Sequence, residues 1–252
     1  MAGNPNEESS SGADIRAVSR AADVLGLFST DRPELTAAEV GELLGLNRTT
    51  AYRYCTSLLS AGLLERGSQS ASFVPGGALL RIGAFALSMR RVMDLAAVHM
   101  SHVADAANAT VILSLWTPTG PVVSKVQENR HQGAIVTVRI GTQLPLTSAQ
   151  GITFLAFLSD RTHVARLLAM LPDHERQRVE VQVEKTRQSG SCFVTSHRGI
   201  TAIATPIFDE TGCCATMAVI GTNEMLPESS SLVRNELINA SRALSAEMGG
   251  SQ

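Results

Sequence analysis

A short run of polar and basic residues between positions 47 and 56 carries side chains that can contact nucleic acid. Four of them recur at i, i+3, i+4 and i+7, the spacing of one helix face: Thr49, Tyr52, Arg53 and Thr56. An arginine on such a face can donate two parallel hydrogen bonds to guanine, and hydroxyl groups bind phosphates or base edges. Small and apolar residues recur on the opposite side as Ala51, Cys55, Leu58 and Gly62. We therefore expect a helix that packs through one face and presents the other to DNA.

The residues before this helix supply the elements that would hold it in place. Thr36 and Glu39 have the spacing of a capping box, which begins a helix, and this helix is expected to extend to about Leu46. Its inner face would carry Val40, Leu43 and Leu44. Asn47 is then a suitable N-cap for the second helix. Two short helices joined by a tight turn predict a helix-turn-helix motif, with an ordinary helical hairpin as the alternative.

A β-hairpin pattern follows the second helix directly. Residues 63–66 and 71–74 resemble strands, and they flank a small polar loop at 67–70. A hairpin at this place is a wing, whose tip would carry Arg66 and Gln69 to the phosphate backbone or the minor groove. We expect Arg53, Tyr52 and Thr49 to contact base edges in the major groove. The phosphates would be bound by Arg48, Thr50, Arg20 and Arg66.

The overall charge is −2, which argues weakly against nucleic-acid binding, so the distribution of charge matters more than its sum. The basic residues that are expected to share one face are all arginines: Arg16, Arg20, Arg48, Arg53 and Arg66. Three acidic residues, Glu34, Glu39 and Glu42, are expected on the opposite side. No lysine precedes Lys125. We therefore expect modest nonspecific affinity for DNA that depends on a few arginines.

A second set of reactive side chains would suit an enzyme. Cys192 and His197 can be drawn as a nucleophile and a base, but no third supporting group or elbow motif surrounds them. Neither common form of the phosphate-binding glycine loop is present. We expect neither catalysis nor a cofactor, although a Cys192/His197 enzyme is the least favoured alternative.

Metal and redox chemistry have little support in the sequence. His99 and His102 share a helix face but lack further ligands at suitable spacing, and the four cysteines form no C-x-x-C pair. Cys55 is expected in a core, and the vicinal Cys213 and Cys214 at the start of a strand. Reduced thiols in a cytoplasmic protein are the expectation, with a thiol sensor as the alternative.

Hydropathy and length limit the class of protein. No apolar run approaches the roughly 20 residues that span a bilayer, and the polar N-terminus predicts no signal peptide. Residues 1–13 lack apolar periodicity and are expected to be disordered. The 252 residues suffice for two domains.

Periodicity along the chain predicts these domains. A helix at 15–28, the helix-turn-helix and the wing form a first domain at 14–76, and helices at 77–107 link it to a second domain at 108–252. There the pattern predicts strands at 110–116, 121–127, 134–138, 193–195, 199–204 and 215–220, a hairpin turn at 209–212, and helices at 147–157, 161–171, 174–188 and 229–246. This order predicts an α+β fold built on an antiparallel sheet.

The chain resembles the IclR-type transcriptional regulators over nearly its whole length from Ile15. In the first domain the resemblance rests on residues 19–21, 35–39, 43–46, 49–50 and 64–65, with Arg53, Leu58 and Gly62, and then on Phe73 and residues 76–83. In the second it rests on residues 148–151 (Ser-Ala-Gln-Gly), 154–156, 199–200, 203–204 and 206–209, with Gly212.

The resemblance implies a ligand-responsive repressor or activator with a winged helix-turn-helix domain and a GAF-like effector-binding domain. Such proteins form homodimers, often homotetramers, and a dimer would place two recognition helices about 34 Å apart on a pseudo-palindromic operator. The linker helix would transmit effector binding to the DNA-binding domains. A wing-fold protein-interaction module without DNA binding is the alternative.

The resemblance also implies an effector pocket, lined by Ser148, Ala149, Gly151, Thr195, Ala202, Ala218 and Ile220. A helix N-terminus with small residues suits an anion; the alternative is that Ala149 and Gly151 simply permit close packing. The chain departs from the family at Ile152, where a lysine is common, at residues 195–198, where acidic residues are usual, and at Ala218 and Ile220, where polar side chains occur. We therefore expect a more apolar pocket and a larger or aromatic effector anchored by a carboxylate.

Overall fold

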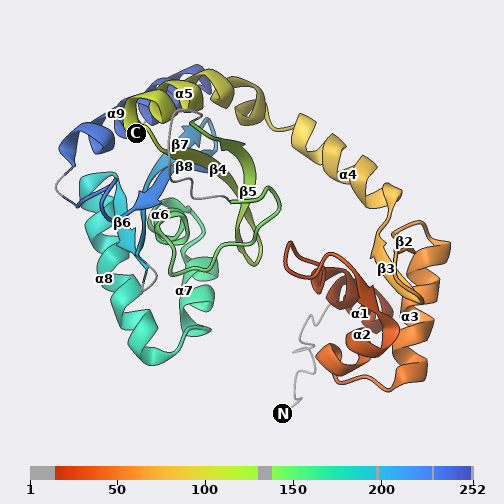
Figure 1. Cartoon of the computed structure of the whole chain (residues 1–252). Coiled ribbons are helices and arrows are strands. Elements are labelled where there is room, and N and C mark those ends of the chain that lie inside the picture. Colours follow the sequence, from red (N-terminus) through yellow and green to blue (C-terminus); the bar gives the residue numbers. More distant parts are fainter. Residues whose placement is uncertain (1–14, 130–137, 197–198, 229, 251–252) are drawn as a thin grey trace, which may run out of the picture. The chain divides into compact units, whose positions relative to one another are not determined.

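The computed structural model describes residues 15–129, 138–196, 199–228 and 230–250. The chain forms two compact units that divide between Phe85 and Ala86 (Figure 1).

The first unit is a winged helix-turn-helix. Its elements are α1 (Arg16–Gly26), β1 (Leu35–Thr36), α2 (Ala37–Leu44), α3 (Arg48–Ser60), β2 (Leu64–Arg66) and β3 (Ser72–Pro75). The strands form an antiparallel sheet in the order β1-β3-β2. The predicted helix pair and wing are confirmed. Strand β1 was not predicted, because two residues are too few for any periodicity.

Side-chain caps begin both helices of the motif as the sequence predicts. The Thr36 hydroxyl accepts a hydrogen bond from the Glu39 backbone at 3.3 Å, and the Glu39 carboxylate accepts one from the Thr36 backbone at 2.7 Å. Helix α2 ends at Gly45, whose φ of 65° is left-handed. The Asn47 side chain then accepts from Thr50 N at 2.8 Å and begins α3.

The core of the first unit confirms most of the predicted inner face. Its buried residues include Val24, Val40, Ala51, Cys55, Leu58, Leu64 and Phe73. Leu43, which was expected inside, is 47% exposed. The reason is Gly41, which faces α3 so closely that a Cβ there would lie 3.4 Å from the Ala51 Cβ. Leu43, two residues further along α2, consequently points away from this contact.

The predicted linker at 77–107 contains two different helices. Helix α4 (Gly77–Ser88) buries none of its residues. Helix α5 (Arg91–Ala107) instead buries Val92, Ala96, Met100 and Val103 in the core of the second unit. Only α4 therefore has the character of a connection, and α5 is part of the second unit.

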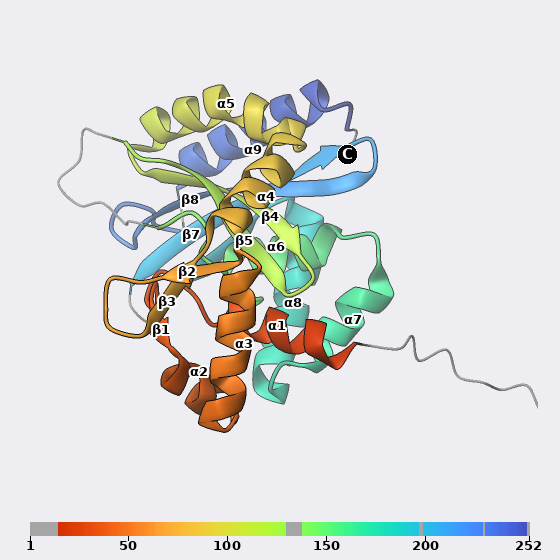
Figure 2. The same cartoon turned by 90° about the vertical axis from the view of Figure 1, so that its right-hand side faces the viewer.

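The second unit is an antiparallel sheet with helices on both faces, which confirms the predicted α+β class. The strands, in the order β5-β4-β8-β7-β6, are β4 (Thr110–Thr117), β5 (Gly120–Gln127), β6 (Cys192–Thr195), β7 (Ile200–Asp209) and β8 (Gly212–Thr222). Helices α5 and α9 (Ser231–Glu247) lie side by side on one face (Figure 2). The other face carries α6 (Ala149–Phe157), α7 (Arg161–Ala169) and α8 (Asp173–Ser189).

Apolar residues, several of them alanines, fill the space between α6 and the sheet. This α6-side layer includes Ile112, Ala149, Ile152, Ala204, Ala218 and Ile220, with Trp116 and Ala202 partly buried at its margin. Adjacent strands place Ile112 opposite Ala218, and Ala202 opposite Ile220. Short side chains on neighbouring strands let α6 approach the sheet closely.

Two further predictions have different outcomes. The hairpin turn between β7 and β8 is confirmed, and there the Asp209 carboxylate accepts a hydrogen bond from Thr211 N at 2.8 Å. Residues 134–137 of the strand predicted at 134–138 lie outside the described residues, and Val138 itself is not in a strand. Within the described part of the chain, no helix is long and apolar enough to cross a membrane.

Candidate nucleic-acid interface and effector site

The outer face of α3 presents the predicted base-contacting residues to solvent. Arg48, Thr49, Tyr52 and Arg53 are exposed, and Tyr52 is 50% exposed despite its aromatic ring. Among the residues that the structure describes, neither Arg48 nor Arg53 forms an ion pair. Their guanidinium groups are therefore available to an anionic partner.

Two of the predicted contacts are already engaged within the protein. The Thr56 hydroxyl lies 2.9 Å from Tyr52 O and 3.1 Å from Arg53 O, so its proton is used within α3. Arg20 pairs with Asp23 at 3.4 Å. Such an exposed ion pair is weak, so Arg20 can still exchange this partner for a phosphate, whereas Thr56 offers only lone pairs.

The wing is a short hairpin with a tight loop. Its base is formed by Leu64 opposite Pro75, and Arg66 lies opposite Phe73. The Arg66 guanidinium carbon lies 4.8 Å from the centre of the Phe73 ring, so the arginine reaches across the hairpin to its partner strand. Gln69 is exposed in the loop, where its backbone N–H binds Glu34 at 2.7 Å.

This contact corrects the predicted charge distribution. Glu34 was expected on the side away from the arginines, together with Glu39 and Glu42. Its carboxylate instead lies against the wing loop, beside the predicted DNA contact Gln69. No local pattern indicates this contact, because it joins residues 35 positions apart.

The predicted effector residues divide into two groups. Ala149, Ala202, Ala218 and Ile220 all belong to the α6-side layer. Thr195 does not. Thr195 is in β6 and lies opposite Thr201 of β7, one position beyond the pair Val194 and Ala202. Its side chain is therefore on the other face of the sheet. Thr195 therefore cannot line the same pocket, and its hydroxyl lies 3.1 Å from that of Thr201.

The start of α6 favours the packing role for its glycine. Ser148 caps the helix, accepting from Gly151 N at 3.0 Å and donating to Pro145 O at 2.6 Å. A Cβ on Gly151 would lie 2.6 Å from both Pro145 O and Leu146 O. Gly151 therefore permits the preceding loop to approach the helix, which is the alternative that the sequence left open.

A buried polar group in the same layer was not predicted from the sequence. The Gln150 side chain donates to the Ser114 hydroxyl at 2.9 Å, and both residues are buried. Thr216 lies directly opposite Ser114 in the sheet. Its hydroxyl is buried and has no hydrogen-bond partner among the residues that the structure describes. The sequence feature that could have indicated this buried polar group is Gln150, which lies within the Ser-Ala-Gln-Gly run.

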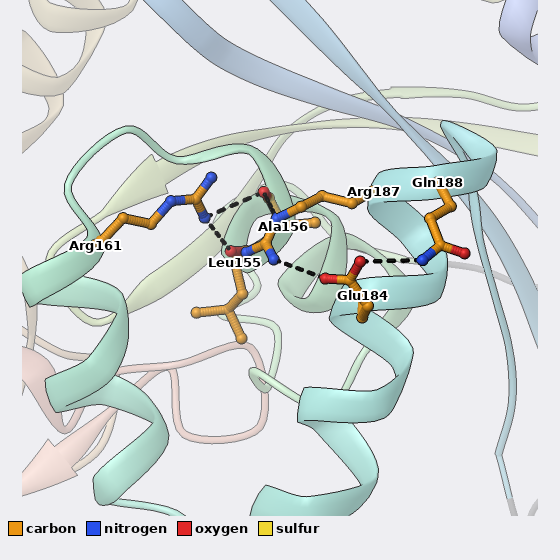
Figure 3. A network of polar contacts seen from close by, with 6 residues as sticks. All are labelled: Leu155, Ala156, Arg161, Glu184, Arg187 and Gln188. Carbon is orange, nitrogen blue, oxygen red and sulfur yellow. Dashed lines mark hydrogen bonds and ion pairs between the residues drawn. The ribbon is translucent and has the colours of Figure 1, made fainter.

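The other end of α6 is fixed by two arginines (Figure 3). Arg161 reaches Leu155 O and Ala156 O at 3.4 and 3.3 Å, and Arg187 donates to Ala156 O at 3.0 Å. Arg187 is in turn held by Glu184 at 3.0 Å. Cationic groups at a helix C-terminus neutralise its partial negative charge. Arginines of α7 and α8 thereby join these two helices to the C-terminal end of α6.

A separate polar cavity of about 440 Å³ lies between α8, β6 and the beginning of α9. Lys185, Thr186, Phe193 and Arg234 contribute to its lining. None of the predicted effector residues lines it.

The thiols do not have the character of nucleophiles or sensors. Burial raises the pKa of Cys192 to about 11 and that of Cys214 to about 12, and it also raises the pKa of Cys213. Thiolate, the reactive form, is therefore scarce at neutral pH. His197 lies outside the described residues. Cys55 is buried in the first core, as predicted.

The two histidines of α5 join it to α9. His99 lies 3.0 Å from Glu247, and His102 lies 3.3 Å from Glu236. Both histidines therefore lie where α5 meets α9. Within residues 15–129, 138–196, 199–228 and 230–250, no group of three His, Cys, Asp or Glu side chains could hold a metal ion.

Known proteins resemble this chain in both units. Residues 17–68 match the family model of the IclR helix-turn-helix domain, and residues 84–246 match that of the bacterial transcriptional regulator IclR C-terminal domain. The HTH-type transcriptional regulator XynR of Escherichia coli is 22% identical over 93% of this chain and 98% of its own length.

Solved structures share the fold. A crystallised IclR transcriptional regulator from Silicibacter has a TM-score of 0.82 at 21% identity, covering 93% of this chain and 97% of its own. An IclR homologue from Microbacterium hydrocarbonoxydans, crystallised with 4-hydroxybenzoate, has a TM-score of 0.70 at 20% identity, covering 92% and 98%. The second family model alone covers more than half of the chain. The chain therefore belongs to the IclR family of bacterial transcriptional regulators.

Proposed function

We propose that this regulator binds a pseudo-palindromic operator as a homodimer, with α3 in the major groove, and that a small effector alters the binding. The observation that carries the proposal is the exposed α3 face, where Arg48 and Arg53 have no ionic partner among the described residues. An unpaired arginine on the second helix of a helix-turn-helix suits base and phosphate recognition.

The contacts divide by function. Arg53, Tyr52 and Thr49 would read base edges, because they point outward from the N-terminal half of α3. Arg48, Thr50 and Arg20 would bind phosphates, as would Arg66 and Gln69 of the wing. Phosphate contacts fix the register, and base contacts give the sequence preference. We place this function in the cytoplasm, where bacterial operator DNA is found.

Exposed apolar side chains on α4 support a homodimer. Leu80 is 76% exposed and Phe85 67% exposed, although α4 is largely apolar in sequence. Ile15 and Val18 of α1 are likewise exposed. Burial of such surface against a second copy is favourable. We propose a second copy as the partner because two half-sites require two recognition helices; tetramers would need a further interface.

The effector is proposed to be an aromatic or other largely apolar acid in a GAF-like second domain. The α6-side layer supports this through its apolar residues, among them Ala149, Ala218 and Ile220. The buried pair Ser114 and Gln150 supplies polar groups at the same layer. An IclR homologue with 4-hydroxybenzoate bound shows that a similar fold accommodates an aromatic acid.

DNA binding is tested by a gel-shift assay on duplexes from the region upstream of the protein's own gene. Wild type should give a specific, salt-sensitive complex, because phosphate contacts release counterions. Arg53→Ala should lose the specific complex while keeping the same thermal unfolding midpoint. Wild-type affinity in Arg53→Ala would contradict the assignment. Absence of any salt-dependent binding by wild type would favour the protein-interaction module.

Effector binding is tested by fluorescence, because Trp116 is the single tryptophan and lies at the margin of the α6-side layer. Titration with benzoate or 4-hydroxybenzoate should change its emission and raise the unfolding midpoint. Pyruvate and glyoxylate serve as controls. A response to these small acids alone would contradict an apolar effector.

A further inference from the structure

The loop of the wing is closed around a carboxylate that comes from outside the hairpin. Glu34 lies just before β1, and its side chain accepts hydrogen bonds from Ser68 Oγ at 2.9 Å and from Gln69 N at 2.7 Å. The Ser72 hydroxyl also donates to it. The three partners lie 34 to 38 residues further along the chain. One acidic side chain thus holds the whole loop between β2 and β3.

The loop is shaped to admit this carboxylate. A Cβ on Gly67 would lie 2.0 Å from Glu34 Oε1 and 2.5 Å from Ser72 Oγ, so any other residue at this position would displace the acid. Ala71 has a φ of 60°, which is costly for a residue with a Cβ. Ser72 is 1% exposed, and its backbone carbonyl oxygen accepts a hydrogen bond from Gly67 N at 3.1 Å. The loop is therefore packed tightly around the Glu34 carboxylate.

The charge of Glu34 is at first sight unfavourable for a protein that binds DNA. A carboxylate close to phosphates is repelled, yet here its oxygens face three donors within the loop. These hydrogen bonds, with that of Gln69 the largest contribution, hold the pKa of Glu34 below its ordinary value. The acid is ionised at neutral pH and its charge is directed inward.

We propose that Glu34 is a positioning residue for DNA recognition, which holds the wing loop in the conformation that reaches the DNA beside the recognition helix. The inference rests on the proposed function, since it requires the wing to contact DNA. Holding the loop in advance removes the entropy cost of ordering it on binding. Gln69 would then meet the backbone or minor groove with its side chain, while its N–H stays on Glu34.

Two variants disturb the contact in different ways, and a third serves as the matched control. Glu34→Gln removes the charge and replaces one of the two acceptor oxygens with an amide donor, so the three donors of the loop share a single neutral acceptor. Gly67→Ala keeps the charge but fills the space that the carboxylate occupies. Glu42→Gln removes the same charge from an exposed position on α2, in the same unit. Thermal unfolding of the full chain shows that each variant is folded.

The affinity of each variant is measured on two operator duplexes, one extending past the wing contacts and one trimmed to the bases read by α3. On the long duplex we expect Glu34→Gln and Gly67→Ala to bind about tenfold more weakly than wild type, since one to two net hydrogen bonds are lost. On the trimmed duplex all proteins should bind alike. Hydroxyl-radical footprints of both loop variants should lose protection at the outer edges only.

Three results would contradict the inference, and they differ in what they say about the proposed function. Equal affinities and equal footprints on the long duplex would overturn the inference while leaving the proposed function in place. Tighter binding by Glu34→Gln, similar to that of Glu42→Gln, would show that Glu34 merely repels phosphates, and it would also overturn the inference. Failure of wild type to bind any duplex would overturn the proposed function and this inference with it.

Discussion

The Glu65 carboxylate accepts a hydrogen bond from the backbone N–H of Gly77 at 2.7 Å, and so joins wing strand β2 to the first residue of α4. Two backbone hydrogen bonds reinforce this junction. Gly76 N donates to Leu63 O at 2.9 Å, and Ala78 N donates to Gly62 O at 3.2 Å. Because Gly62 and Leu63 come just after Ala61, the C-cap of α3, the beginning of α4 is fixed to the end of the recognition helix. A change in the direction of α4 would therefore move α3 and the wing together.

This junction predicts a large effect of Gly76→Ala. A Cβ there would lie 2.4 Å from Gly62 O, a backbone atom that cannot move without breaking the junction. We expect a loss of about 2–3 kcal/mol in unfolding free energy, the usual size for strain of this kind. Gly83→Ala, in the exposed middle of α4 with nothing within 4 Å, is the control and should be neutral or slightly stabilising. Equal unfolding midpoints for both variants would contradict the junction.

The capping box predicts a pH dependence of stability. Hydrogen bonds from the Thr36 backbone and hydroxyl lower the pKa of Glu39 below its ordinary 4.5. A carboxyl whose pKa is lower in the folded state stabilises the fold above its unfolded pKa, and this contribution disappears as the pH falls through the folded pKa. Unfolding midpoints of wild type and Glu39→Gln should therefore differ at pH 7 and converge in acid. A constant difference from pH 7 to pH 3 would show that the carboxylate has no such role.

Removal of the Thr216 hydroxyl should make the protein more stable and its response to ligand weaker. Its hydroxyl is buried without a hydrogen-bond partner among the described residues, so Thr216→Val removes an unfavourable group at constant shape. The ligand-free protein should gain about 1 kcal/mol. The matched control is Thr205→Val, because the Thr205 hydroxyl lies 2.6 Å from that of Ser241 and its loss should destabilise the protein.

The same Thr216→Val protein should respond less than wild type to benzoate or 4-hydroxybenzoate, if the free hydroxyl serves the effector. Tryptophan emission and the ligand-induced rise in unfolding midpoint measure this response. A Thr216→Val protein that is less stable than wild type and responds fully to both acids would place the hydroxyl outside the effector site.

The sequence predicted those parts of the fold that rest on local signals. Thr36 and Glu39 act over three residues, as does Asn47 with Thr50, and both caps were predicted. The face on which Thr195 lies depends on how β6 pairs with β7, and this pairing is not contained in either segment alone. Glu34 was misplaced for a similar reason, since its partners follow more than 30 residues later. Contacts of this range arise only when the complete fold brings the segments together.

The exposed face of α3 was predicted correctly because its pattern is periodic. Such a period can be recognised without knowing which segments the helix packs against. Ala51, Cys55 and Leu58 are buried, whereas Thr49, Tyr52 and Arg53 face solvent. Leu43 shows the limit of the same reasoning. In a helix as short as α2, a single close approach at Gly41 decides which side is inside.

The central claim is that α3 reads a two-fold related DNA sequence, and it is tested most directly by selection of bound duplexes from a random pool. Wild-type protein should enrich a pseudo-palindrome whose half-sites are about one helical turn apart. Arg53→Ala, folded to the same unfolding midpoint, should lose the preference at the bases read by that arginine while keeping weak, salt-dependent binding. Enrichment of no sequence by wild type, or of the same sequence by Arg53→Ala, would contradict the account.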